Sequence, residues 1–171
     1  DKELKNSLWN VISISIIEHL KSRDWIYQTS YETLINSIWF SFFKEPLDNI
    51  SNDTSRIASE IRTRFFNWDY LETYDFLDFL STLSNEFDTD EFIHSCNFIL
   101  KRELSGYRFV NGKLAPITSE EEINAIERAI NSTSDNGLKG VNIHLTEALN
   151  KLSDKKNPDY RNSIKESISA V

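Results

Sequence analysis

The chain has 171 residues, of which 39% are hydrophobic and 12% aromatic, so it can bury a packed core and is not a disordered sequence. Only four glycines and three prolines occur, which argues against an all-β fold, and a formal charge of −8 argues against general nucleic-acid binding. The single cysteine excludes an internal disulfide, and we expect a cytoplasmic protein with no membrane partner.

Apolar residues at helical spacing predict a first helix over residues 2–21. The run VISISII inside it alternates and is β-branched, so a strand is the alternative there, although the length of the pattern favours a helix. A second helix is expected from Thr29, which forms a capping box with Glu32, to a stop at Pro46.

Three more helices are predicted between the polar linker SNDTSR and residue 106. Their apolar rows are Ile57, Ile61, Phe65 and Trp68; Leu71, Tyr74, Leu77 and Leu80; and Phe92, Cys96, Ile99 and Leu100. Gly106 is expected to cap the last of them, because glycine readily adopts the left-handed conformation that ends many helices.

The stretch GYRFVNGKLAPI predicts a short β-hairpin near residues 107–117. Asn111 and Gly112 form its turn, because a type I′ turn needs positive φ at both central residues. A helix then restarts, with Thr118 and Glu121 as its capping box.

Two further helices are expected from LKGVNIHLTEALNKLSD and from NPDYRNSIKESISAV. In the second, Tyr160, Ile164, Ile168 and Val171 form one apolar face, and no stop signal follows. We therefore expect a piece of a longer chain, an interpretation that fits the absence of methionine. The predicted fold is mainly α, a bundle of about eight helices with one short β-hairpin.

The usual catalytic and cofactor motifs are missing from the sequence. The three histidines do not stand at metal-ligand spacing, the acidic residues between 69 and 91 match neither a di-iron nor a calcium motif, and no glycine-rich phosphate loop occurs. These acidic residues are best interpreted as a solvated face. We expect no metal, no cofactor and no catalytic residue within this segment.

A group of polar side chains near the end of the chain could contact phosphate. Its members are Lys151, Lys155, Lys156, Arg161, Asn162 and Lys165. Tyr107, Phe109 or Tyr160 could stack on bases beside them. The alternatives are a solvated helix end for the lysines and, for Arg161, a salt bridge to Asp159, Glu166 or the facing helix.

Three stretches, KELKNSLWN, CNFILKRELSGYRFVNGKLAPITSEEEINAIERAI and ALNKLSDKKNPDYRNSIKESISAV, resemble the AbiJ-type N-terminal domain of bacterial abortive-infection (phage-defence) proteins. The resemblance covers most of the chain and is closest from Phe92 onward, whereas residues 22–90 match only in aromatic character. It implies a following helical region of the HEPN type, a ribonuclease module whose motif is Arg, four to six residues, then His. Arg161 and Asn162 resemble the start of that motif, but no histidine follows.

The resemblance leads to a domain assignment and three functional hypotheses. We expect a helical domain over 1–106, the hairpin over 107–117, and a helical segment over 118–171 that begins a HEPN-like bundle. The first hypothesis is a non-catalytic regulatory or sensor module whose partner is a C-terminal effector domain of the same chain, with a homodimer expected by analogy. The second is an RNA-binding or RNA-cleaving domain that uses Arg161 and nearby lysines. The third is a structural helical scaffold.

Overall fold

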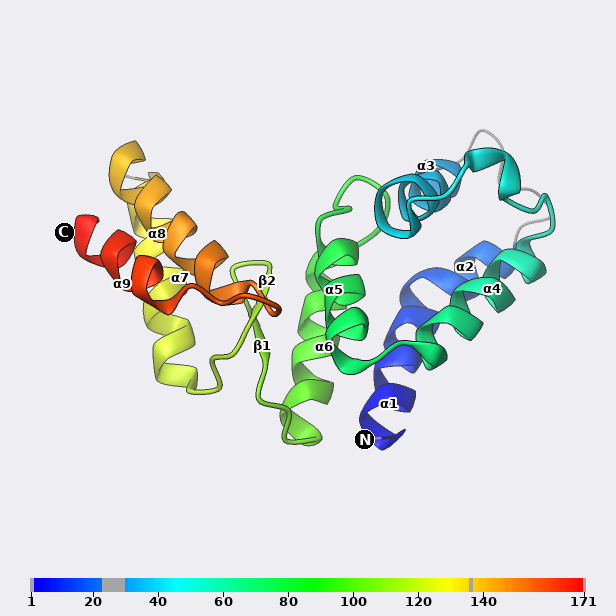
Figure 1. Ribbon diagram of the computed structural model, residues 1–171, viewed down its shortest axis with the longest axis horizontal. Coiled ribbons are helices and arrows are strands. Elements are labelled where there is room, and N and C mark those ends of the chain that lie inside the picture. The colour runs from blue at the N-terminus through cyan, green and yellow to red at the C-terminus, as the bar shows by residue number, and fades with distance from the viewer. Residues whose placement is uncertain (1, 23–29, 136, 171) are drawn as a thin grey trace. The chain divides into compact units, whose positions relative to one another are not determined.

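The computed structural model describes residues 2–22, 30–135 and 137–170, so the predicted cap Thr29 lies outside the described residues. The described chain is mainly helical with one two-stranded antiparallel hairpin, which confirms the predicted fold class (Figure 1). It divides into two compact units, Asp1–Ile99 and Leu100–Val171. Within the described ranges, every helix is too short or too polar to cross a membrane.

The first unit is built from helices around a core rich in aromatic rings. Its helices are α1 (Lys2–Ile12), α2 (Glu18–Lys21), α3 (Ser30–Ser37), α4 (Thr54–Asn67), α5 (Tyr70–Ser81) and α6 (Thr89–Arg102), the last of which runs into the second unit. Phe65, Phe76 and Phe92 are fully buried, and the rings of Trp68 and Phe76 lie 5.1 Å apart. Burial of such large apolar side chains is the main source of stability in a small helical unit.

Among the described residues of this unit, two stretches are π-helical, with one extra residue in the turn. Ser13–Ile17 joins α1 to α2 without a break, and Ile38–Phe43 extends α3. The strand considered for VISISII is therefore wrong. The extra residue lets Ile12, Ile16 and Ile17 all be buried while Ile14 remains exposed, so the alternating pattern is accommodated within a helix.

The end of α6 differs from the expected glycine cap. Leu104, with φ of 54°, holds the left-handed position, and Gly106 does not have a positive φ. The Ser105 N–H donates to the Leu100 carbonyl at 2.9 Å and the Leu104 N–H to the Lys101 carbonyl at 3.1 Å, the bond pattern of a Schellman motif. The prediction for Gly106 is wrong because the helix ends earlier than expected, and hydrogen bonds to helix carbonyls fix the position of the cap.

In the described residues of the second unit, three helices and the hairpin surround a smaller apolar core. Its elements are β1 (Arg108–Val110), β2 (Lys113–Ala115), α7 (Glu120–Asp135), α8 (Lys139–Ser153) and α9 (Tyr160–Ser169). Phe109 pairs with Leu114 in the hairpin, and buried side chains of both strands pack with α7 and α8. The buried members of this core are Val110, Ala115, Ile117, Ile130 and Leu149.

The N-cap of α7 (Glu120–Asp135) lies one residue later in the sequence than predicted. The Ser119 hydroxyl accepts the Glu122 N–H at 3.3 Å and donates to the Glu121 carboxylate at 3.0 Å. Ser119 is therefore the N-cap, and the assignment of Thr118 is wrong. Both residue types cap helices well, so the choice between these neighbours depends on where the backbone leaves β2.

Candidate interaction face on helix α9

The start of α9 is fixed by a short polar network. The Asp159 carboxylate accepts the Asn162 backbone N–H at 3.0 Å and the Asn162 side-chain amide at 2.6 Å. These hydrogen bonds are the largest cause of the lowered pKa of Asp159, and the nearby charges of Lys151 and Arg161 contribute to it. Asn162, predicted as a phosphate contact, is thus already bound to a carboxylate.

Polar contacts also hold α9 against α8. The buried Ser163 hydroxyl donates to the Ala148 carbonyl at 2.8 Å, and Nδ1 of His144 lies 2.8 Å from Oε2 of Glu166. Sequence reasoning missed both contacts, because neither side chain has a local signal and each partner lies on a different helix. Glu166, considered as a salt-bridge partner of Arg161, contacts His144 instead.

Because α9 turns the buried Ser163 toward α8, its apolar side faces outward. Tyr160, Ile164 and Ile168 lie on one face, as the spacing predicts, but they are 55%, 61% and 69% exposed. Val171, the fourth member of the predicted face, lies outside the described residues. A helix of a globular protein normally turns such a row toward the core. This inverted orientation is the most unusual feature of the second unit.

The six predicted phosphate contacts do not share one environment. Lys151 is 2.8 Å from the Glu147 carboxylate, and this hydrogen bond is the main cause of its raised pKa. Lys155 and Lys156 lie in the segment between α8 and α9, where the carboxylate of Asp154 accepts the Lys156 N–H. Arg161 and Lys165 are exposed on α9, four residues apart.

The outward face of α9 carries a shallow hollow of about 570 Å³. Its lining consists of Arg161, Asn162, Ile164, Lys165, Ile168 and Ser169. Two cations thus stand beside two exposed isoleucines. Within the described part of the chain, neither the Arg161 guanidinium nor the Lys165 ammonium forms an ion pair.

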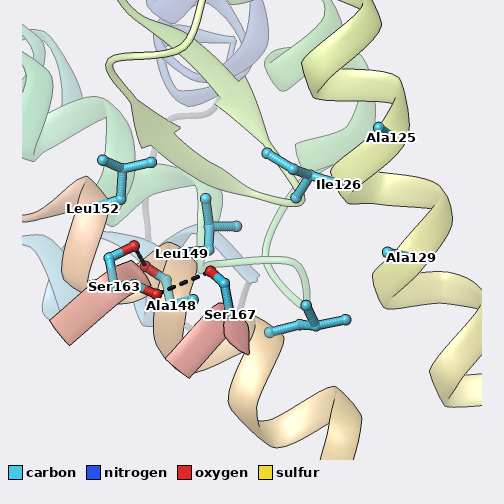
Figure 2. A pocket seen from close by; sticks show the side chains of 9 residues that line it. Ala125, Ile126, Ala129, Ala148, Leu149, Leu152, Ser163 and Ser167 are labelled. Carbon is cyan, nitrogen blue, oxygen red and sulfur yellow. Dashed lines mark hydrogen bonds between the residues drawn. The ribbon is translucent and has the colours of Figure 1, made fainter. Parts of the chain in front are cut away.

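A separate apolar groove of about 310 Å³ lies among α7, α8 and α9 (Figure 2). It is lined by Ala125, Ile126, Ala129, Leu145, Ala148, Leu149, Leu152, Ser163 and Ser167. Its two hydroxyls already donate hydrogen bonds to backbone carbonyls, Ser163 to Ala148 and Ser167 to Ser163 (Figure 2). The groove therefore offers mainly apolar contact, and the protons of its two hydroxyls are already donated to the backbone.

The hairpin turn has the backbone that its sequence requires. Asn111 and Gly112 have φ of 46° and 75°, and the Asn111 N–H donates to the Glu127 carboxylate on α7 at 3.3 Å. Phe109 is fully buried, so the expectation that it could stack on a base is wrong. Tyr160 is the most exposed of the three aromatic residues considered for stacking.

The remaining candidates for chemistry have structural roles or lie apart. Asp69 and Glu72, two of the acidic residues after position 68, form a capping box at the start of α5. Burial raises the pKa of the Cys96 thiol well above its usual range, which makes it a poor nucleophile. Across the described ranges, no group of three or more His, Cys, Asp or Glu side chains is placed to hold a metal ion.

Comparison with known families gives one result. The model of the AbiJ N-terminal domain 4 family matches residues 1–132, about three quarters of the chain. The matched region contains all of the first unit, the hairpin and most of α7, whereas α8 and α9 follow it. No curated protein and no solved structure matches the chain.

Proposed function

Since this chain belongs to the AbiJ N-terminal domain 4 family, it is a module of an abortive-infection protein, and we propose that it acts there as a non-catalytic regulatory or interaction module. Its partner would be an effector domain, C-terminal to it in the same chain, of the HEPN-like ribonuclease type. The helical segment over 118–171 would form the junction between them. The homodimer expected by analogy stays a prediction.

The observation that supports this proposal is the outward apolar row of α9. One hydrogen bond from Ser163 and a contact between His144 and Glu166 hold the opposite side of the helix on α8. The row of Tyr160, Ile164 and Ile168 therefore stays exposed unless another body covers it. A surface of this kind suits a domain that works by contact rather than by chemistry.

The first test compares RNA cleavage by this segment and by the full-length protein. We expect cleavage only by the full-length protein, because the segment lacks a histidine after Arg161 at the spacing of the ribonuclease motif. Cleavage by the segment alone that Arg161→Ala abolishes would overturn the proposal. His144 would then be the first candidate for the base.

A second test addresses the interface in the full-length protein. Ile164→Glu places a charge on the outward row, and we expect it to change the cleavage rate without unfolding the module. Ile143→Glu is the matched control, since Ile143 is 64% exposed on α8, close to the 61% of Ile164. If the two variants behave alike, α9 does not contact the effector and this role for the module is wrong.

A further inference from the structure

The outward face of α9 combines an apolar row with charge of one sign. Ile164 and Ile168 lie four residues apart, and Arg161 and Lys165 follow the same spacing beside them. Residues four apart in a helix lie on the same side, so the two rows run parallel along the axis. A partner that covers the isoleucines therefore also approaches both cations.

The carboxylates at the start of α9 and within it already contact other groups. Asp159 is bound to Asn162 at the start of the helix, and Glu166 contacts His144 of α8. Arg161 lies near enough to Asp159 to contribute to its lowered pKa, but that carboxylate remains committed to the helix cap. The described residues thus leave the face apolar and cationic.

These observations specify the chemistry of the partner. We propose that the partner segment on α9 is an amphipathic helix with an aliphatic ridge and a row of carboxylates along one flank. The ridge would pack against Tyr160, Ile164 and Ile168, because rows of residues four apart interdigitate between helices. The carboxylates would pair with Arg161 and Lys165, which otherwise lose water without compensation when the face is covered.

Charge also argues against a second α9 as the partner. A copy of this helix would bring its own Arg161 and Lys165 toward the same cations, and like charges at an interface oppose association. The inference rests on the proposed function, since it names the kind of segment that the effector side presents to this face.

The experiment uses two synthetic helical peptides of about 18 residues, roughly five turns. Both carry the same leucine and isoleucine ridge, but one has glutamates and the other lysines along the flank. Binding of each labelled peptide to the 171-residue chain is measured by fluorescence anisotropy. We expect the glutamate peptide to bind at least about tenfold more tightly, and its advantage to shrink as salt rises.

Two double variants make the test specific. Arg161→Glu with Lys165→Glu should reverse the preference, so that the lysine peptide binds better. Lys21→Glu with Arg56→Glu changes the net charge equally within the first unit, and it should leave the preference as it was. Equal binding of the two peptides, or no binding of either, would overturn the inference.

The outcomes also separate this inference from the proposed function. If Ile164→Glu changes cleavage by the full-length protein but reversal of the two cations does not, the module contacts its effector through a face that does not select for acidic flanks. In that case the inference fails and the proposed function stands. If neither change has an effect, both fail.

Discussion

At the residue scale, Leu104 has a backbone conformation that leucine rarely adopts. Its φ of 54° closes α6, and its side chain is 90% exposed, so it contributes little burial in return. In the left-handed region, a side chain destabilises the folded state by about 1–2 kcal/mol. A glycine stabilises the unfolded chain by about 0.4–1 kcal/mol, because it gives that chain more conformational entropy. Leu104→Gly should therefore raise the free energy of unfolding by about 0.5–1 kcal/mol, as measured by urea denaturation.

Gly106→Ala is the matched control for that experiment. Gly106 does not have positive φ, and a Cβ built on it would meet no atom within 4 Å. We expect the alanine variant to be unchanged within about 0.5 kcal/mol or slightly stabilised. A loss of more than about 1 kcal/mol at Gly106, without a gain at Leu104, would restore the glycine as the cap of α6.

The carboxylate of Asp159 should make the stability of α9 depend on pH. Hydrogen bonds from Asn162 hold its folded pKa below the ordinary value, so its contribution is present above that value and is lost as the pH falls toward the folded pKa. Asp159→Asn keeps a good capping side chain but removes the titration. We expect this variant to lose less stability than the unaltered chain between pH 5 and pH 3, in urea unfolding at both pH values.

Asp48→Asn serves as the control, because it removes one negative charge from an exposed position in the first unit. If both variants lose less stability than the unaltered chain between pH 5 and pH 3, net charge is the cause. If only the Asp159 variant loses less stability than the unaltered chain, the titration of the helix cap is the cause.

At the element scale, the rotation of α9 can be tested with two neighbouring residues. Ser163 is buried and its hydroxyl donates a hydrogen bond to the Ala148 carbonyl, whereas Ile164 is exposed. Ser163→Leu should cost about 1–3 kcal/mol, because it overpacks the contact with α8 and removes the hydrogen bond. Ile164→Ser should change stability by less than about 0.5 kcal/mol in the same thermal or urea unfolding experiment.

The opposite result would mean that the apolar row packs inward. Ile164→Ser would then be the costly change, as the periodicity alone predicts. The two substitutions act on adjacent residues of one helix, so differences in helix length or cap strength cannot explain a contrast between them.

Elements with a strong local signal could be predicted from the sequence, and those decided by tertiary contact could not. The hairpin follows from Asn111 and Gly112, whose positive φ values are a local requirement of the turn. The existence of α9 follows from its spacing, but its rotation depends on the hydrogen bond of Ser163 and the contact between His144 and Glu166. Periodicity shows which residues share a face, but it does not show whether that face is covered.

The π-helical turns illustrate the same limit within one helix. VISISII has the alternation of a strand, yet Ser13–Ile17 remains helical, with an extra residue that brings both Ile16 and Ile17 into the core. Single-residue shifts of this kind leave no separate mark in a 3.6-residue pattern. For the candidate interaction face, the sequence therefore indicated the residues but not the contacts of Ser163 and Glu166 with α8 that turn them outward.

At the scale of the whole molecule, charge is divided unevenly along the chain. Residues 1–100 carry eight basic and seventeen acidic side chains, a balance of −9, and residues 101–171 carry eleven and ten, a balance of +1. Even in the second part, Lys151 is paired with Glu147, and Asp159 and Glu166 lie among the basic residues of α8 and α9. Nucleic-acid affinity depends largely on the number of phosphates that a protein neutralises, so this distribution opposes it.

We therefore expect no measurable binding of a single-stranded RNA of about 20 nucleotides, longer than a typical site of roughly 4–16, at about 150 mM salt. Fluorescence anisotropy of the labelled RNA across a salt series is the measurement. Binding that weakens steeply as salt rises, with a slope reduced by about 0.7 in Arg161→Ala, would instead identify a direct phosphate contact. Because Arg161 also borders the apolar row, that result would mean that the α9 face contacts RNA and not a protein partner.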